Sequence, residues 1–424
     1  MMCNGDGLRL KEERLGFDLG IRAQRPAMEL GRLTICRCNR KSSLSDPIPP
    51  DVLMLVISIL PAKSVGKCRS VSKLWKLILG RPEFNEMFLT NSLNRPQFLF
   101  AFILDSEGEF PFFTSPQLES PNQDNSSSLV ATPHNHSYVP AGLSQISQPV
   151  RGWVCIECIE DERNVFVICS PLTGESMILP ILKRKTAEVK CFLVYDPIEK
   201  QFKVLCTFWP RFESGNITAN HCVLTLGTEP TVWRKLECCK PLCPVLHCGD
   251  GICINGFLYY MAQLNDSSSE VFIVCFDIRF EKLSYINKPE DLWHVGFESR
   301  LINHKGQLGI IQSLNSVTID RRTTCFVLWV LKDIEKHEWT KHIYEVPLLW
   351  WDIVGDKSLC IVGMTGTCEV VLLSPYQPDP FYLFFYNLEK NIVRRVEIRG
   401  FEGYKHSPSV ALCFLDYVEA VNSI

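Results

Sequence analysis

Apolar positions between residues 48 and 78 recur at helical spacing, and few positions in this stretch are polar. The first part contains two apolar helix faces, one with Leu53, Val56, Ile57 and Leu60, the other with Val52, Leu55 and Ile59. Pro61 ends this predicted helix. A helix that is apolar on nearly all sides must be buried on nearly all sides.

Two more short helices follow in the same segment. Ser64 is a predicted N-cap of the second helix and Ser72 of the third, and Gly80 with Pro82 ends the third. The pattern thus predicts an all-α module of three short helices at 45–92. A unit of this size is hard to stabilise alone. Its spare apolar surface is therefore covered either by the downstream chain, as a helical cap, or by a partner protein.

From Arg95 onward, short apolar runs alternate with turn residues, which predicts a large all-β domain over 94–418. A strand, a turn and a second strand recur at 193–205, 274–286, 329–342 and 384–398, with a further copy at 223–237. Asp196, Asp277, Asp333 and Asn387 mark the turns. Repeats of this kind are typical of β-propeller blades, although they leave the blade count open. A two-sheet sandwich with long insertions is the alternative.

Composition narrows the class of protein. The chain has 424 residues, a net charge of −3 and 21% charged residues, which favours neither nucleic-acid binding nor membrane association. It has no signal-peptide core or membrane-spanning apolar run, so we expect a cytoplasmic or nuclear location. Residues 1–44 are locally basic and predicted to be disordered. Residues 115–147 are rich in Ser, Asn, Pro and Gln and are predicted to form a long flexible loop.

Twenty cysteines invite a metal or disulfide hypothesis. Most of them lie within apolar strand-like runs, where they behave as small buried hydrophobes. The group Cys238, Cys239, Cys243, His247, Cys248 and Cys253 does not have the spacing of a zinc motif. Cys155 and Cys158 have Cys-x-x-Cys spacing but should point to opposite faces of a strand. We therefore predict neither a metal site nor a cofactor.

The helical segment resembles an F-box. The resemblance rests on Ile-Pro at 48–49, Leu-Pro at 60–61 and Val-Ser-Lys-x-Trp at 71–75. It implies docking on the Skp-family adaptor of a cullin–RING ubiquitin ligase. Carried over by position, the implied adaptor-binding set is Ile48, Pro49, Leu53, Ile57, Leu60, Pro61, Val65, Val71, Ser72, Trp75 and Ile78.

The β region resembles the F-box-associated domain of plant F-box proteins, as in 169–180, 194–205, 251–262 and 363–375. Together the two resemblances imply the substrate-recognition subunit of a Skp–cullin–F-box ligase, which would hold a target protein that the sequence does not identify. No catalytic residue is predicted, because no nucleophile, phosphate-loop or metalloprotease motif occurs. Two alternatives stay open: a sugar-binding or hydrolase propeller with a helical cap, and an adaptor-binding scaffold without a ligase role.

Overall fold

The computed structural model describes residues 48–421 apart from several internal segments. Those segments are 105–108, 118–127, 135–136, 139–142, 161–162, 183–186, 211–218, 239, 241, 246–250, 265–269, 293–298, 315–317, 376–379 and 402–408. The predicted N-terminal segment 1–44 therefore lies outside the described residues. Five helices occur in the described chain, and none has the length and apolar character needed to cross a membrane.

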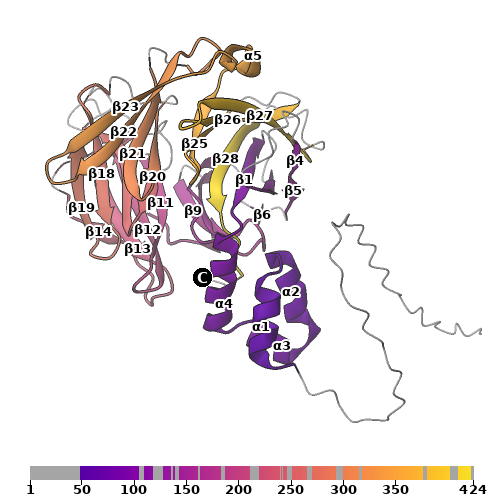
Figure 1. The fold of residues 1–424 in the computed structure, drawn as a ribbon. Helices are drawn as coiled ribbons and strands as arrows, with labels where there is room; N and C mark the ends of the chain where they lie inside the picture. Colours follow the sequence, from indigo (N-terminus) through magenta and orange to yellow (C-terminus); the bar gives the residue numbers. More distant parts are fainter. Residues whose placement is uncertain are drawn as a thin grey trace, which may run out of the picture. The chain divides into compact units, whose positions relative to one another are not determined.

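Four helices, rather than the predicted three, form the N-terminal module (Figure 1). They are α1 (Pro50–Ser58), α2 (Ala62–Val71), α3 (Lys73–Ile78) and α4 (Pro82–Leu93). The prediction missed α4 because Gly80 and Pro82 were taken only as a stop. Pro82 is instead the first residue of α4, where a missing N–H costs nothing.

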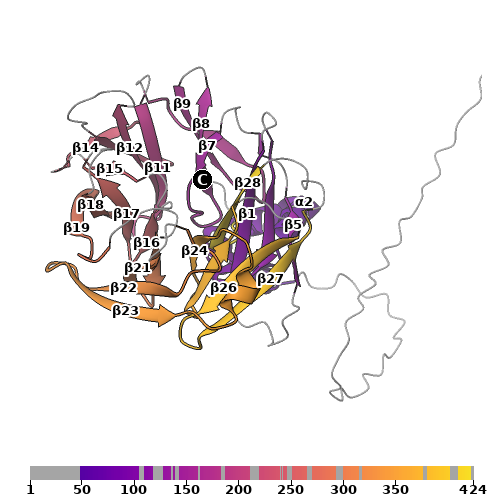
Figure 2. The same cartoon turned by 90° about the horizontal axis from the view of Figure 1, so that it is seen from above.

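The remaining described chain forms six antiparallel blades around a common centre (Figure 2). Blade 1 consists of β28 (Ser409–Tyr417), β1 (Gln97–Leu104), β3 (Phe112–Pro116) and β5 (Thr132–Pro133). Blade 2 consists of β7 (Leu143–Ile146), β8 (Val154–Glu160), β9 (Arg163–Cys169) and β10 (Ser176–Ile178). Blade 3 consists of β11 (Ala187–Asp196), β12 (Gln201–Pro210), β13 (Asn220–Thr225) and β14 (Arg234–Leu236).

The other three blades follow in chain order. Blade 4 consists of β15 (Cys243–Pro244), β16 (Ile252–Ile254), β17 (Phe257–Gln263), β18 (Val271–Asp277) and β19 (Lys282–Asn287). Blade 5 consists of β20 (Ser299–His304), β21 (Gln307–Ser313), β22 (Cys325–Asp333) and β23 (Glu338–Glu345). Blade 6 consists of β24 (Cys360–Met364), β25 (Glu369–Leu373), β26 (Phe381–Asn387) and β27 (Ile392–Arg399), with β4 (Ser128–Val130) parallel to β27. A short helix, α5 (Trp350–Val354), links blades 5 and 6, and β2 (Glu109–Phe110) pairs with β6 (Ser137–Tyr138).

The ring is closed by pairing between the two ends of the β region. β28, near the C-terminus, pairs antiparallel with β1, the first strand after the helices. The hydrophobic clusters of the described residues lie between successive blades, and the one between blades 1 and 2 also includes residues of the helices, so each blade buries both faces. The structure is a six-bladed propeller and not a two-sheet sandwich.

The repeated turn residues have the predicted local role. Side-chain oxygens of Asp196, Asp277 and Asp333 each accept hydrogen bonds from two backbone N–H groups that follow, and Asn387 accepts one. The sequence comparison, however, matched one hairpin to the wrong pair of strands in its blade. The hairpin 193–205 contains the first two strands of blade 3, whereas the other three repeats are outer hairpins of blades 4, 5 and 6. The outer hairpin of blade 3 is 223–237.

Two sequence predictions about short segments have different outcomes. Residues 115–147, predicted as one long loop, lie partly outside the described residues, but their described part contains β4, β5 and β7, which belong to blades, and β6, which pairs with β2. In the described part the prediction differs from the structure because the polar composition hid short segments that pair as strands. Cys155 and Cys158 do point to opposite faces of β8, since they belong to different hydrophobic clusters.

Candidate functional site

Helix α1 is apolar on two opposite faces, and only one of them is buried. Leu53, Met54 and Ile57 lie in the hydrophobic core, with Leu53 only 6% exposed. The opposite face carries four exposed side chains at i, i+3, i+4 and i+7, namely Val52, Leu55, Val56 and Ile59. The sequence pattern placed Val56 on the same face as Leu53 and Ile57. In the structure Val56 lies on the opposite, exposed face.

The neighbouring segment at α3 continues this exposed apolar character. Val71, Leu74 and Leu77 are exposed, Leu77 to 72%. The Ser72 side chain accepts a hydrogen bond from the Trp75 backbone N–H at 3.1 Å, which confirms the predicted N-cap. Because Ile78 is buried and Trp75 packs partly against the core, α3 is anchored along one side and open on the other.

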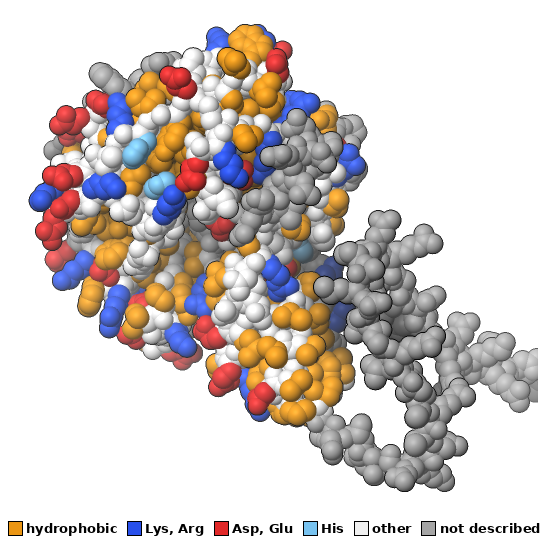
Figure 3. All heavy atoms as spheres, in the orientation of Figure 1, with side chains coloured by type: hydrophobic (Ala, Val, Ile, Leu, Met, Phe, Trp, Pro, Cys, Tyr) orange, Lys and Arg blue, Asp and Glu red, His pale blue; other side chains and the backbone are white. Residues whose placement is uncertain are grey.

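We call Val52, Leu55, Val56, Ile59, Val71, Leu74 and Leu77 the helical apolar surface. Figure 3 shows hydrophobic side chains gathered over α1 and α3. Exposed lysines accompany this surface on α2 and α3, at Lys63, Lys67, Lys73 and Lys76, whereas Asp51 is the only acidic residue in the three helices. Contiguous apolar patches of this kind mark interaction sites.

The structure divides the predicted adaptor-binding residues into two groups. Leu53, Ile57, Val65 and Ile78 are buried in the module's own core, and Leu60 and Trp75 are half-buried. Ile48, Pro49, Pro61, Val71 and Ser72 are exposed. Leu53 and Ile57, which the resemblance implies as adaptor-binding residues, are therefore not on an exposed face, because a short helix with two apolar faces buries one of them first. The spacing of Val52, Leu55 and Ile59 was visible in the sequence and was the signal for the other face.

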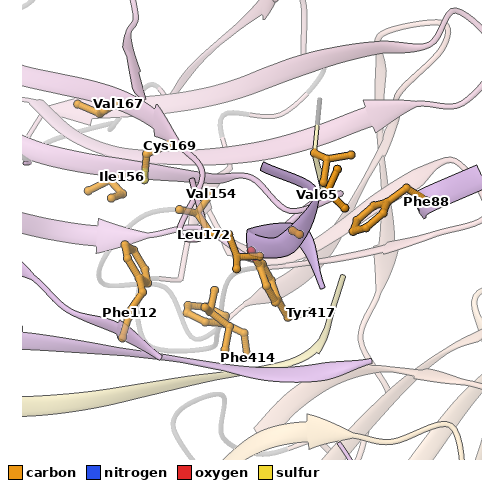
Figure 4. Packing of buried hydrophobic residues seen from close by; sticks show 14 of the residues in the cluster. Val65, Phe88, Phe112, Val154, Ile156, Val167, Cys169, Leu172, Phe414 and Tyr417 are labelled. Carbon is orange, nitrogen blue, oxygen red and sulfur yellow. The ribbon is translucent and has the colours of Figure 1, made fainter. Parts of the chain in front are cut away.

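The helices share one hydrophobic cluster with blades 1 and 2 (Figure 4). Val65 and Phe88 from the helices belong to the same cluster as Val154, Phe414 and Tyr417 from the strands. Phe88 is fully buried and lies 6.2 Å from Phe84, measured between ring centroids. The module thus completes its core with the propeller while leaving the helical apolar surface open.

We call the packing of the helical module against blades 1 and 2 the joint. Polar contacts to the chain's last described residues reinforce it. The buried Glu419 carboxylate accepts a 2.7 Å hydrogen bond from the Ala62 backbone N–H and a 3.1 Å bond from the Gln97 amide. Ala62 is the first residue of α2, so a negative charge lies where the helix dipole favours it. This contact explains why α2 begins two residues before the predicted cap Ser64: the cap is supplied by a residue more than 350 positions away.

A second anchor is Arg69 on α2. Its guanidinium donates to the backbone carbonyls of Val421 and Leu79. Partial burial lowers the pKa of Arg69, with Glu175 acting in the opposite direction. At the solvent-exposed edge of the joint, Arg151 of the propeller forms a 3.2 Å ion pair with Glu86 of α4. These contacts connect the helical module to the propeller at several independent points.

A cavity of about 240 Å³ lies where the innermost strands of the blades converge. Its described lining contains one carboxylate, Asp416, and one aromatic side chain, Phe192. A glycosidase needs two carboxylates that flank the bond to be broken. The described lining, with one carboxylate, does not match the pair that a glycosidase needs.

The cysteine group is only partly described. Cys239, His247 and Cys248 lie outside the described residues, whereas Cys243 is buried and Cys253 lines the central cavity. In the part of the chain that is described, no three metal-ligating side chains come together.

Comparison with known proteins follows the same division of the chain. Residues 47–87 match the family model of the F-box domain, and residues 98–418 match that of the F-box associated beta propeller domain. The chain is a plant F-box protein. It is 38% identical to F-box protein At5g65850 of Arabidopsis thaliana, with 95% of this chain and 98% of that protein aligned. It is 42% identical to F-box protein DOR of the same plant, with 89% and 94% aligned.

Membership of this family implies a role in ubiquitin ligase complexes. An F-box joined to a propeller domain fits, in general terms, the role of a substrate receptor, and F-box proteins are generally non-catalytic adaptors.

Proposed function

We propose that this F-box protein is the substrate-recognition subunit of a Skp–cullin–F-box ubiquitin ligase. In this proposal the helical apolar surface docks on a Skp-family adaptor, which connects the protein to a cullin, and the propeller holds a target protein. The observation that carries the proposal is the division of α1 into a buried apolar face and an equally apolar exposed face. Exposing four large aliphatic side chains on one helix is unfavourable unless a partner covers them.

The adaptor contact in this proposal differs from the sequence-based set. The exposed members Ile48, Pro49, Pro61, Val71 and Ser72 are retained, while Val52, Leu55, Val56, Ile59, Leu74 and Leu77 are added. The buried members Leu53, Ile57, Val65 and Ile78 pack in the core beneath the helical apolar surface and hold the helices in place. The lysines on α2 and α3 favour a partner whose apolar groove has an acidic rim.

No residue of this chain carries out bond chemistry in the proposal. The receptor raises the effective concentration of a target lysine near the charged ubiquitin-conjugating enzyme. The joint formed by Glu419, Arg69 and the shared hydrophobic cluster supports this role, since it links adaptor docking to target holding.

The test is capture of the full-length chain from plant cells whose proteasome is inhibited, compared with a Leu74→Asp/Leu77→Asp variant. Adaptor, cullin and ubiquitinated partners should all copurify with the wild-type chain. The variant should lose adaptor and cullin but keep the partners, now without ubiquitin. A scaffold without a ligase role would retain adaptor and partners with no ubiquitinated species, and that result would refute the proposal.

A further inference from the structure

The central cavity of the propeller contains a positive charge that no described side chain neutralises. It is lined by residues from all six blades, including Gln148, Phe192, Cys253, Arg300, Val362 and Asp416. The side of β20 that carries Arg300 also carries Ile302, which packs in the core between blades 5 and 6. Figure 2 shows β11, β16, β24 and β28 arranged around this centre.

The described neighbours of Arg300 leave its charge uncompensated. Two described groups sense it electrostatically, the thiols of Cys360 and Cys413. Burial raises the pKa of Cys360 to about 11 and that of Cys413 still further, so both thiols are neutral near pH 7. A guanidinium stays charged at any physiological pH. Arg300 is half-buried, and holding its charge there without a counter-ion among the described side chains is unfavourable.

The single carboxylate of the described lining serves a different contact. Asp416 accepts a 2.8 Å hydrogen bond from the Gln117 amide, and its backbone N–H donates to the same side chain at 2.9 Å. Burial raises the pKa of Asp416, while the Gln117 hydrogen bond opposes the rise. Among the described residues, the Arg300 side chain has no ion-pair or hydrogen-bond partner, although its backbone pairs with Ile311 in the sheet.

We propose that this cavity binds a small anion, with Arg300 pairing with the anion's carboxylate or phosphate group. Arginine matches both groups geometrically, because its planar N–H fork can face two oxygens at once. The rest of the lining suits a compact apolar body, since Leu301, Ile302, Val362 and Met364 contribute aliphatic surface. The cavity is smaller than the roughly 300–1,000 Å³ that drug-sized ligands occupy, so the ligand should be small.

Solvent can reach the cavity, which a reversible ligand requires. Asn303, Cys253 and Asp416 line it and are exposed. Protein atoms surround the Cys253 thiol closely enough that burial raises its pKa to about 12, although part of the residue remains in contact with solvent. The proposal is independent of adaptor docking, because none of these residues lies in the helical module.

Calorimetric titration of the full-length chain with orthophosphate and, separately, with benzoate tests the proposal. At least one anion should bind saturably with one site per chain, and the two arms show which oxyanion is preferred. Arg300→Gln should weaken binding by about tenfold or more, whereas Arg300→Lys should retain part of it. The matched control is Arg279→Gln, which removes an exposed arginine from the outer turn of blade 4.

A second readout does not depend on the folding of a variant. Saturating anion should slow alkylation of Cys253 in the wild-type chain, measured on its own peptide by mass spectrometry. If neither anion binds saturably, the cavity holds water only and the proposal is refuted. Binding of equal strength in the Arg300→Gln variant, or unchanged alkylation of Cys253 at saturation, would also refute it.

Discussion

The helical module and the propeller blades use apolar residues in opposite ways. Nine of the large hydrophobic side chains exposed in the described chain lie between Ile48 and Leu93. The other fourteen lie in the much longer propeller, four of them close in sequence to α5, at Ile343, Leu348, Leu349 and Trp351. Each blade buries both of its faces against neighbours. In α1, one apolar face is buried and the other is open. The helices thus leave one apolar face uncovered, whereas the blades cover theirs, blades 1 and 2 together with the helices.

This difference shows which substitutions should affect stability and which should affect binding. Buried residues at the joint belong to both regions, so their loss should destabilise helices and blades together. Residues of the helical apolar surface belong to neither core, so their loss should leave the fold unchanged.

The largest stability effect should come from the shared cluster. Phe88→Ala removes a fully buried ring between α4 and the blades, and it should lower the free energy of unfolding by about 3–5 kcal/mol. Thermal unfolding followed by circular dichroism measures this change. Leu93→Ala, at an exposed position of the same helix, is the control and should change little. A small loss in Phe88→Ala would mean that the helices and blades do not share a core.

A pH dependence of stability should come from Glu157 in blade 2. Glu157 is buried on β8 with one carboxylate oxygen unpartnered, and burial raises its pKa to about 8. Because the folded pKa lies above the unfolded value near 4.5, stability is lost as pH rises from about 4.5 to 8, by up to about 1.4 kcal/mol for each pH unit.

Glu157→Gln should remove this loss, so the variant's stability relative to the wild type should increase with pH over that range. Urea unfolding at several pH values measures it, with Glu160→Gln at the exposed end of the same strand as the control. Parallel pH profiles for Glu157→Gln and the wild type would show that Glu157 is ionised in the folded chain.

A smaller effect should follow from removing the carboxylate that caps α2. Glu419→Ala leaves the Ala62 N–H and the Gln97 amide without this acceptor and should cost about 1–3 kcal/mol. Hydrogen exchange should increase first at the start of α2, because that N–H loses its partner. Uniform exchange across the chain would argue against a local cap.

The smallest effect should be electrostatic. Lys73→Gln together with Lys76→Gln should weaken adaptor binding by about 1 kcal/mol or less and reduce its dependence on salt, because exposed charges are screened by ions. Binding measured at low and high salt tests this expectation. An unchanged salt dependence would place the lysines outside the contact.

Much of the architecture could be predicted from the sequence. The helical spacing of α1, the Ser72 cap and the Asp or Asn turns of the blades are local features, and local patterns report them. The start of α2 was missed because its cap, Glu419, comes from the other end of the chain. The choice between the two apolar faces of α1 was missed for a similar reason: both have the right spacing, and only tertiary packing decides which is buried. The number of blades and the position of Arg300 in the wall of the central cavity likewise depend on contacts between distant segments.

The most direct test of the central claim compares two valines of almost equal exposure, Val56 on α1 at 54% and Val232 in the propeller at 53%. Each is replaced by Asp in the full-length chain, and the affinity for a purified Skp-family adaptor is measured by calorimetry. Val56→Asp should weaken binding by at least about 2 kcal/mol, as expected for a central contact residue, with no comparable loss of thermal stability. Val232→Asp should bind like the wild type. Equal affinities for the two variants would contradict the assignment of the helical apolar surface as the docking site.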